Sequence, residues 1–207
     1  DIRYAEQFSV DYLADGSALA EVADGRRYLI IPDGGEVPEQ LPEDVTVISQ
    51  PENIYLASSS SMDLFSSLDC LGDILASSTP ESGWKLPEIA QAMADEDILY
   101  AGKYSSPDIE LLMSEGCDLA IENMMIYHSP KTAEQIESCG IPVFIERSSA
   151  ESHPLGRLEW VRLYGLMLGK SDEAEKFFSE KCSLLDEVTS CLFIHISEPT
   201  RQEAISY

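Results

Sequence analysis

Basic residues are scarce in this chain. Its 207 residues include 13 lysines and arginines against 38 aspartates and glutamates, which gives a formal net charge of −25. Proteins that bind nucleic acids need a basic surface to displace the counterions of the phosphate backbone, so this composition argues against that class of partner. The same charge disfavours unassisted binding to an anionic membrane. The simplest role of the acidic excess is solubility.

Long apolar runs and paired cysteines are lacking as well. No apolar run reaches the roughly 18 residues that a membrane-spanning helix needs. The five cysteines are widely spaced, odd in number and form no C-x-x-C pair, which argues against a disulfide framework or a zinc site. We expect most of them to be small buried apolar side chains. The sequence opens at Asp1 without a basic and then apolar leader, which fits a processed product or a trimmed chain.

Short catalytic motifs are also missing. The sequence contains no G-x-S-x-G, H-E-x-x-H or G-x-x-x-x-G-K-[ST] pattern. The serines at 58–61 lack the tight glycine flanks that an exposed nucleophile requires. The many carboxylates leave a two-carboxylate mechanism open but select no pair for it. We therefore expect a protein that is not an enzyme, and a small-molecule hydrolase using Ser59 or His153 is the weakest of three hypotheses.

The first part of the chain has the pattern of a β-meander. FSVDYLADG alternates apolar and polar residues, and ALAEV and RRYLII follow it. Asp-Gly pairs at 15–16 and 24–25 separate these runs, and such pairs favour tight hairpin turns. The turn-rich, acidic stretch 34–44 is expected to be a connector.

From Val45 onward, strands and helices alternate. Short apolar runs typical of buried strands are followed by stretches with helical spacing, and this order predicts βαβ units with a mainly parallel, Rossmann-like sheet. One predicted helix takes Ser106 as N-cap and Pro107 as its first residue, with Ile109, Leu112 and Met113 toward the core. The predicted strands are 45–49, 53–58, 73–78, 119–125 and 141–146.

Two helices are expected after the last of these strands. Residues 154–168 are apolar on almost every side, which indicates a buried helix with Trp160 and Tyr164 as wedges and Gly165 at a close approach. Gly169 ends it, and Ser171 begins an amphipathic helix of about 18 residues. The run CLFIHIS at 191–197 has the composition of a strand.

Four stretches carry a family resemblance. They are PENIYLASSSSMDLFSSLDCLGDILASS, YAGKYSSPDIELLMSEGCDLAI, IPVFIERSSAESHPLGRLEW and GKSDEAEKFF. In this order they resemble the substrate-binding proteins of ABC importers for iron–siderophores, haem and cobalamin. That family has two α/β lobes joined by one long helix, with ligand in the cleft between them. Cys117 departs from the pattern, which usually has proline there, and most of a second lobe is missing.

The resemblance implies a division of the chain into four parts. Residues 1–44 form the meander and connector, 45–170 an α/β binding lobe, 171–190 the lobe-joining helix and 191–207 a remnant of the second lobe. It further implies that Glu110, predicted to lie off the core stripe of its helix, docks to an arginine pocket of the permease. The alternative for Glu110 is an acidic residue favoured by the helix dipole.

Candidate ligand-binding residues follow the predicted strands, because open α/β sheets bind ligands outside the carboxyl ends of their strands. The serines could also serve only as helix caps, and His153 fits a helix-capping or core role better than that of a ligand. Ligation of a metal by His128 is not expected. Methionine, tyrosine and histidine together suit haem or another aromatic ligand. Arg157 is expected to pair with the carboxylate of Glu151 or Glu159. The candidates are Ser59, Ser60, Ser61, Trp84, Tyr104, Asn123, Met124, Met125, Tyr127 and His153.

The leading hypothesis is therefore an extracytoplasmic binding protein, either periplasmic or a cell-surface lipoprotein. It would carry an iron chelate, haem or corrinoid as transported ligand, without an intrinsic cofactor or metal. Its partners would be an ABC permease and its ATPase, and it would contact the membrane only through a lipid anchor that this chain does not contain. The second hypothesis is a non-transport α/β module that binds a protein partner.

Overall fold

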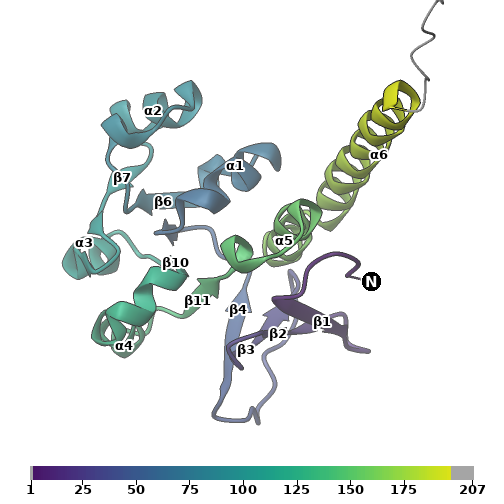
Figure 1. Cartoon of the computed structure of the whole chain (residues 1–207). Coiled ribbons are helices and arrows are strands. Elements are labelled where there is room, and N and C mark those ends of the chain that lie inside the picture. Colours follow the sequence, from purple (N-terminus) through teal and green to yellow (C-terminus); the bar gives the residue numbers. More distant parts are fainter. Residues whose placement is uncertain (1, 197–207) are drawn as a thin grey trace, which may run out of the picture.

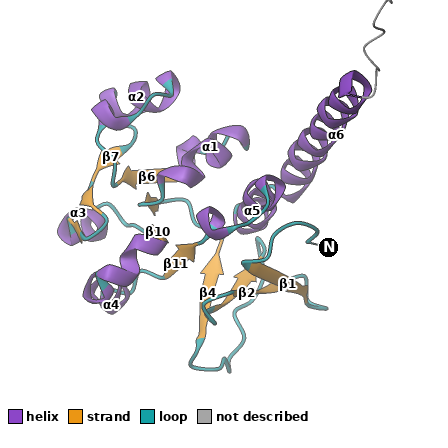
Figure 2. Ribbon diagram, viewed as in Figure 1, coloured by secondary structure: helices purple, strands orange, loops and turns teal. Residues whose placement is uncertain are grey.

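The computed structural model describes residues 2–196 of the chain, and side chains as far as residue 188. Two main sheets, of four and five strands, lie side by side, and a long C-terminal helix extends away from both (Figure 1). A third sheet has only two short strands. Figure 2 shows that most of the helices lie around the five-stranded sheet. The strands of the four-stranded sheet are β1 (Phe8–Tyr12), β2 (Ala18–Val22), β3 (Arg27–Ile31) and β4 (Val45–Ser49).

The expected β-meander is confirmed in β1, β2 and β3, which pair antiparallel in chain order. Gly16 and Gly25, the second residues of the two Asp-Gly pairs, both have φ of +88°, a conformation that favours glycine. The Asp15 carboxylate accepts a hydrogen bond from the Ser17 main-chain N–H at 3.0 Å and fastens the first turn. The two Asp-Gly turns therefore set the register of β1, β2 and β3.

Strand β4 is a correction to the prediction. The run VTVIS was expected in the parallel sheet of the binding lobe, but β4 pairs parallel with β3 in the first sheet. A parallel neighbour requires a crossover of about a dozen residues, and the connector 32–44 supplies it. An apolar run of five residues suits a buried strand in either sheet, so local pattern could not assign its partner.

The second sheet is parallel throughout and has the order β11-β10-β5-β6-β7. Chain order runs outward in both directions from β5 and β10, so the switch point of the topology lies between these two strands. Predicted strands 53–58 and 119–125 are thus neighbours, which confirms the parallel lobe. The strands are β5 (Ile54–Leu56), β6 (Ile74–Ser77), β7 (Leu99–Tyr100), β10 (Leu119–Asn123) and β11 (Val143–Glu146).

Helices cover both faces of this sheet. Leu119 and Ile121 of β10 join a core with α1, α2 and α5, whereas Ala120 joins a second core with α3 and α4. The alternation of side chains along one strand therefore serves two separate cores. The shorter helices are α1 (Ser59–Ser67), α2 (Pro87–Ala94), α3 (Ile109–Ser114) and α4 (Pro130–Ser138), with 3-10 turns η1 (Leu71–Asp73), η2 (Glu81–Gly83), η3 (Met124–His128) and η4 (Ser148–Ala150).

Helix α3 begins later than predicted. Ser106 and Pro107 form β9 (Ser106–Pro107), which pairs with β8 (Gly102–Lys103), and Asp108 is the N-cap. The Asp108 carboxylate accepts from the Leu111 main-chain N–H at 3.0 Å. Met113, expected in the core, is 55% exposed, because the later start and short length leave only Leu112 of α3 fully buried.

The buried apolar helix is confirmed as α5 (Pro154–Met167). It is enclosed because the first sheet, the second sheet and α6 all pack on it, and Trp160 and Tyr164 are both 0% exposed. A Cβ on Gly165 would lie 2.4 Å from the Cβ of Ala174 in α6, so only glycine permits this helix crossing. Gly169, with φ of +67°, separates the two helices as predicted.

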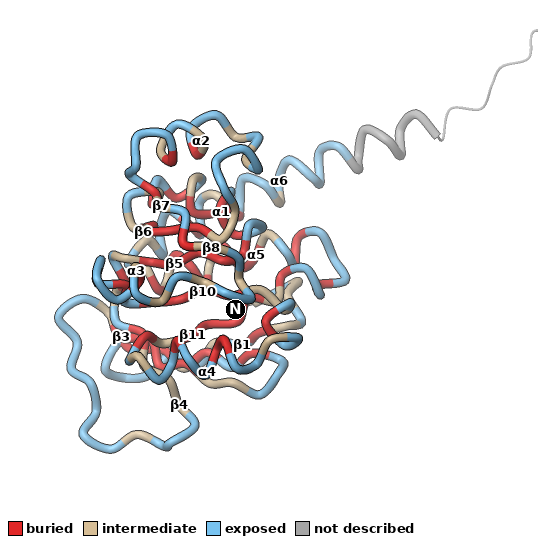
Figure 3. Tube along the Cα trace, turned by 90° about the vertical axis from the view of Figure 1, so that its left-hand side faces the viewer, coloured by how far each residue is buried: buried red, intermediate tan, exposed pale blue. Residues whose placement is uncertain are grey.

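Helix α6 (Ser171–Ile196) is longer than predicted, and the strand expected at 191–197 is wrong over residues 191–196. Its early residues Ala174 and Phe178 are buried, but Leu184 and Val188 are 55% and 49% exposed. Figure 3 shows that α6 projects from the rest of the fold and is largely exposed in its coloured part, which ends at residue 188. Among the described residues, no helix has the length and hydropathy needed to cross a membrane.

The N-terminal strap, residues 2–7, is bound by two buried carboxylates, Glu159 of α5 and Glu151 just before it. Glu159 accepts hydrogen bonds of 2.7–3.1 Å from the main-chain N–H groups of Arg3, Tyr4 and Ala5. Glu151 accepts from the next two, those of Glu6 and Gln7. A Cβ on Gly156 would approach the Tyr4 carbonyl oxygen to 2.7 Å, so the strap lies directly on the helix.

Candidate functional site

The segments that follow β5, β6, β10 and β11 meet at one edge of the parallel sheet, here called the carboxyl edge. They are residues 57–61, 78–84, 123–128 and 147–150. Asn123 joins two of these segments at the switch point, because its Nδ2 donates to the Ala57 carbonyl oxygen at 3.1 Å. Ligands of open α/β folds bind at such a crevice, so the carboxyl edge is the candidate site.

The serines at the start of α1 divide into two groups. Ser58, not Ser59 or Ser60, is the N-cap residue, and its side chain makes no capping bond. Ser59 and Ser60 are exposed at the carboxyl edge. Ser61 is 1% exposed, and its hydroxyl lies 2.8 Å from the hydroxyl of Tyr164 in the core. Two of the three predicted serines are therefore available to a ligand.

Glu146 is a buried residue of this edge that the sequence analysis missed. Its Oε2 accepts from the hydroxyls of Ser58 at 2.8 Å and Ser60 at 3.2 Å, and its Oε1 accepts from the Ser148 main-chain N–H at 2.6 Å. The carboxylate thus fixes the start of α1 against the end of β11. The feature of the sequence that could have identified it is its position, because Glu146 is the charged residue that ends the otherwise apolar run IPVFIE.

Asn123 is the last residue of β10 and the N-cap of the turn η3, which contains Met124, Met125 and Tyr127. The Asn123 Oδ1 accepts from the Met125 main-chain N–H at 2.8 Å, and Met125 is 49% exposed. Met124 is half-buried. Tyr127 is engaged with the first sheet, because its hydroxyl donates to Asp24 at 2.6 Å and accepts from Arg147 Nη1 at 3.0 Å. Burial, and then the hydrogen bond to Asp24, raise the pKa of Tyr127.

Trp84 and Tyr104 come from loops after β6 and β7. Trp84 is half-buried, and its Nε1 donates to the Thr79 carbonyl oxygen at 3.2 Å. Tyr104 lies in the turn between β8 and β9 and packs on the core under α3 and α4. The two rings therefore belong to different faces of the sheet, and Trp84 packs with the core on the α1 face.

His153 is the N-cap of α5. Its Nδ1 accepts from the Leu155 main-chain N–H at 3.0 Å, and its ring stacks on Tyr4 at 5.1 Å between centroids. No histidine accepts a hydrogen bond from Ser59, Ser60 or Ser61 within the described part of the chain, so a serine–histidine pair is not formed there. Residues 2–196 also contain no group of three or more His, Cys, Asp or Glu side chains that could hold a metal ion.

One pocket opens at the carboxyl edge between α1, η4 and α5, and is called the α1–α5 pocket. It has a volume of about 280 Å³ and takes Ser60 and Asp63 from one wall and Arg157 from the other. Arg157 was expected to pair with a carboxylate, but its Nε donates to the main-chain oxygen of Glu151 at 3.3 Å. Glu159 instead pairs with Arg162 at 3.1 Å, because these two residues lie one turn apart on α5.

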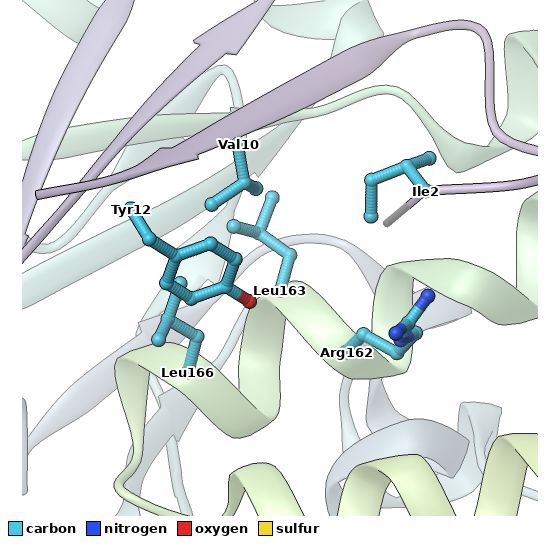
Figure 4. Close-up of a pocket in the computed structure, with 6 residues that line it drawn as sticks. All are labelled: Ile2, Val10, Tyr12, Arg162, Leu163 and Leu166. Atoms are coloured by element: carbon cyan, nitrogen blue, oxygen red, sulfur yellow. The ribbon is translucent and has the colours of Figure 1, made fainter.

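A second pocket, shown in Figure 4, lies away from the carboxyl edge. It has a volume of about 50 Å³ and lies between β1 and α5, with Val10 and Tyr12 on one side and Leu163 and Leu166 on the other. Arg162 at its rim is already bonded to Glu159 and Glu175. Its size and position make it a packing gap between the first sheet and α5.

Two buried polar groups lie in the core under α3 and α4. Both oxygens of Glu122 and the hydroxyl of Tyr55 have no hydrogen-bond partner there. Glu122 is 0% exposed, and burial raises its pKa from 4.5 to about 8. Burial, and then the proximity of Glu122, also raise the pKa of Tyr55. The neighbouring Cys117 thiol, whose pKa burial raises to about 11, adds no charge near neutral pH.

Glu110 lies in the first turn of α3 and is exposed, as its position off the core stripe predicted. Its neighbours on the helix, Ile109 and Leu111, are half-buried. The side chain is therefore free to meet a partner.

Comparisons with known proteins give the fold. No protein-family model matches the chain. An uncharacterised lipoprotein of Methanocaldococcus jannaschii is 23% identical over 173 residues, which cover 76% of this chain and 40% of that protein. Among solved structures, a periplasmic haem-binding protein of Pseudomonas aeruginosa has a TM-score of 0.57 at 18% identity, covering 72% of this chain and 50% of that one.

Two further solved structures agree. A periplasmic binding protein of Veillonella parvula has a TM-score of 0.56 at 14% identity and covers 89% of this chain and 53% of that one. The petrobactin-binding protein YclQ of Bacillus subtilis has a TM-score of 0.54 at 14% identity, covering 82% and 52%. The chain thus has the α/β fold of periplasmic substrate-binding proteins and spans about half of their length. The resemblance seen in the sequence is confirmed at the level of the fold.

Proposed function

We propose that this chain is part of the substrate-binding component of an ABC importer that takes up iron as a ferric siderophore or as haem. The observation that carries the proposal is the assembly of the carboxyl edge at the switch point of a sheet whose fold is that of periplasmic binding proteins. Ser59, Ser60, Asn123 and Met125 stand at this edge, and they would form one wall of a ligand cleft. A corrinoid remains a candidate ligand from the sequence resemblance alone.

The protein would bind its ligand without transforming it. The solved structures that share the fold are named as binding proteins, and in the described part of the chain the hydroxyls of Ser58 and Ser60 donate to the Glu146 carboxylate and to no histidine. Such a component would work outside the cytoplasm, in the periplasm or as a surface lipoprotein. The fold of periplasmic proteins and the likeness to an archaeal lipoprotein support this location.

The division of the chain into a meander (1–44), a binding lobe (45–170), a lobe-joining helix (171–190) and a remnant of a second lobe (191–207) becomes a proposal with two changes. Helix α6 continues to Ile196, so the boundary between the last two parts moves from residue 190 to Ile196. Pairing of β4 with β3 moves the boundary between the first two parts beyond Ser49. The exposed apolar side chains of the outer α6, Leu184, Leu185 and Val188, would meet a second lobe of the complete protein.

Equilibrium titration tests the ligand class. The chain is titrated with haem, a ferric citrate chelate and a ferric trihydroxamate while tryptophan fluorescence is followed, because Trp84 lies in the loop after β6. Saturable 1:1 binding of at least one iron chelate is expected. Absence of saturable binding for all of them would refute the proposed function.

A second experiment tests the importer partner. Glu110→Ala should leave chelate affinity unchanged and reduce uptake in cells that depend on this importer, since an exposed carboxylate can dock to an arginine pocket of a permease. Glu134→Ala, which removes another exposed carboxylate from α4, is the matched control. Equal effects of the two substitutions on uptake would refute a docking role for Glu110.

A further inference from the structure

We infer that the α1–α5 pocket binds a carboxylate group of the transported chelate and that Arg157 is the residue that selects it. The inference rests on the proposed function and narrows it to chelates with an outward-facing carboxylate. It depends on three features of the pocket: its place at the carboxyl edge, the state of the Arg157 side chain and the chemistry of the opposite wall.

The pocket is part of the candidate site. Ser60 enters it from α1, directly after β5, and Ser149 enters it from η4, directly after β11. Leu64 and Leu158 add apolar surface to its lining. At about 280 Å³ it has room for a substituent of a larger ligand, such as a carboxyl group with its linking carbons, but not for a whole haem or siderophore.

Arg157 is oriented but not neutralised. Its Nε donates to the Glu151 carbonyl oxygen at 3.3 Å, which holds the guanidinium at the pocket. Its Nη1 and Nη2 have no partner among the described residues, whereas Arg26, Arg27 and Arg162 each pair with a carboxylate. A guanidinium whose Nη1 and Nη2 are both free can bind a carboxylate through two parallel hydrogen bonds, a bidentate geometry that a lysine cannot reproduce.

The opposite wall restricts where an anion can lie. Asp63 of α1 lines the pocket, and its carboxylate bonds no residue in the described part of the chain, nor does it form an ion pair with Arg157. The buried Glu146 carboxylate accepts a hydrogen bond from the hydroxyl of Ser60, which belongs to the same wall. A carboxylate is therefore repelled from the α1 side and attracted to the α5 side.

The net charge makes a local cation necessary. With a formal charge of −25, the protein as a whole repels anions. A neutral chelate needs no such residue, but a chelate that carries free carboxylates binds only where a nearby cation outweighs this field. Haem propionates and the carboxylates of a citrate-type chelate share this chemistry.

Binding measurements on four variants test the inference. Wild type, Arg157→Gln, Asp63→Asn and Lys176→Gln are titrated with haem, haem dimethyl ester, ferric citrate and a neutral ferric trihydroxamate. Arg157→Gln should weaken haem or ferric citrate by about tenfold or more, because a charge-assisted pair is lost. Asp63→Asn should tighten the same probe, and Lys176→Gln, a matched loss of charge on α6 outside the pocket, should leave it unchanged.

The probes separate the sources of the carboxylate. If haem responds to Arg157→Gln and its dimethyl ester does not, the propionates are the group that is bound; if ferric citrate responds, the group belongs to a carboxylate siderophore. Arg157→Lys should recover only part of the affinity. Circular dichroism on each variant checks folding, and the opposite signs expected for Arg157→Gln and Asp63→Asn cannot both arise from loss of structure.

Three results would overturn the inference. Equal affinity of wild type and Arg157→Gln for the carboxylate probes, or an equal loss for the trihydroxamate, would refute the role of Arg157 while leaving the proposed function intact. Binding of the trihydroxamate alone would do the same. Failure of every probe to bind wild type would refute both, and is distinguished from the other two by the wild-type titration itself.

Discussion

Glu122 allows the most quantitative test of the fold. It lies in β10, between β11 and β5, and is 0% exposed, and neither carboxylate oxygen has a partner in the core under α3 and α4. Because burial disfavours the charged form, its pKa rises from 4.5 to about 8. The folded protein then keeps this proton between about pH 4.5 and pH 8, where the unfolded chain has lost it.

The sign and size of the effect follow from proton linkage. Where the folded state binds more protons, the free energy of unfolding falls as pH rises. The stabilising contribution of protonated Glu122 is therefore complete below about pH 4.5 and is lost as pH rises to about 8. Between these two pH values the contribution of Glu122 to the unfolding free energy falls by roughly 5 kcal/mol. Glu122→Gln is uncharged at every pH and has nearly the same shape, so it should lack this dependence.

Urea unfolding followed by circular dichroism measures the prediction. The difference in unfolding free energy between Glu122→Gln and wild type should grow in favour of the variant from pH 4.5 to pH 8 and level off above it. Glu134→Gln, an exposed site on α4, controls for the change in net charge. A difference between Glu122→Gln and wild type that stays constant over this pH range would refute the burial of an unpaired carboxylate.

Three further predictions address the packing around the site. Gly165→Ala should lower the unfolding free energy by about 1–3 kcal/mol, because its Cβ would lie 2.4 Å from that of Ala174; an unchanged melting temperature would contradict the α5–α6 crossing. Glu159→Gln should cost about 2 kcal/mol and speed hydrogen exchange at the amides of residues 3–5, which its carboxylate binds, and unaltered exchange there would exclude the strap. Ser61→Ala should cost about 1–2 kcal/mol by leaving the Tyr164 hydroxyl unpaired, whereas Ser59→Ala at the exposed edge should change stability by less than about 0.5 kcal/mol; equal costs would refute the division of the serines.

The parts of the fold that were predicted from sequence are those whose signal is local. The Asp-Gly pairs predicted the hairpins because only a few residues can adopt φ of +88° there. The alternation of short apolar runs with helical periodicity predicted the parallel sheet, and the all-round apolar pattern of 154–168 predicted the buried α5. In each case the residues that decide the structure lie within one turn or one element of each other.

The parts that were missed depend on distant partners. The sheet to which β4 belongs is set by its pairing with β3 across a long connector, and the run VTVIS is compatible with either sheet. The run CLFIHI has the composition of a strand, yet it continues the helix that begins at Ser171. Local apolar composition does not separate these outcomes.

The candidate site was predicted in position but not in detail. Residues after β5, β6 and β10 were expected at one edge of the sheet, and the topology brings them there. Which serine faces the core, and which residues Glu146 binds, depend on contacts between residues 103 and 88 positions apart. The partner of Arg157 depends on the turn before α5. No spacing rule in a single sequence reports such contacts.

Hydrogen–deuterium exchange in the presence of a bound iron chelate tests the central claim most directly. If the carboxyl edge is the wall of a ligand cleft, the chelate that binds in the titration should slow exchange in residues 57–61, 78–84, 123–128 and 147–150. Exchange in β1–β3 and in the outward faces of α3 and α4 should stay unchanged. Protection confined to those other regions, with none at the four segments, would contradict the account.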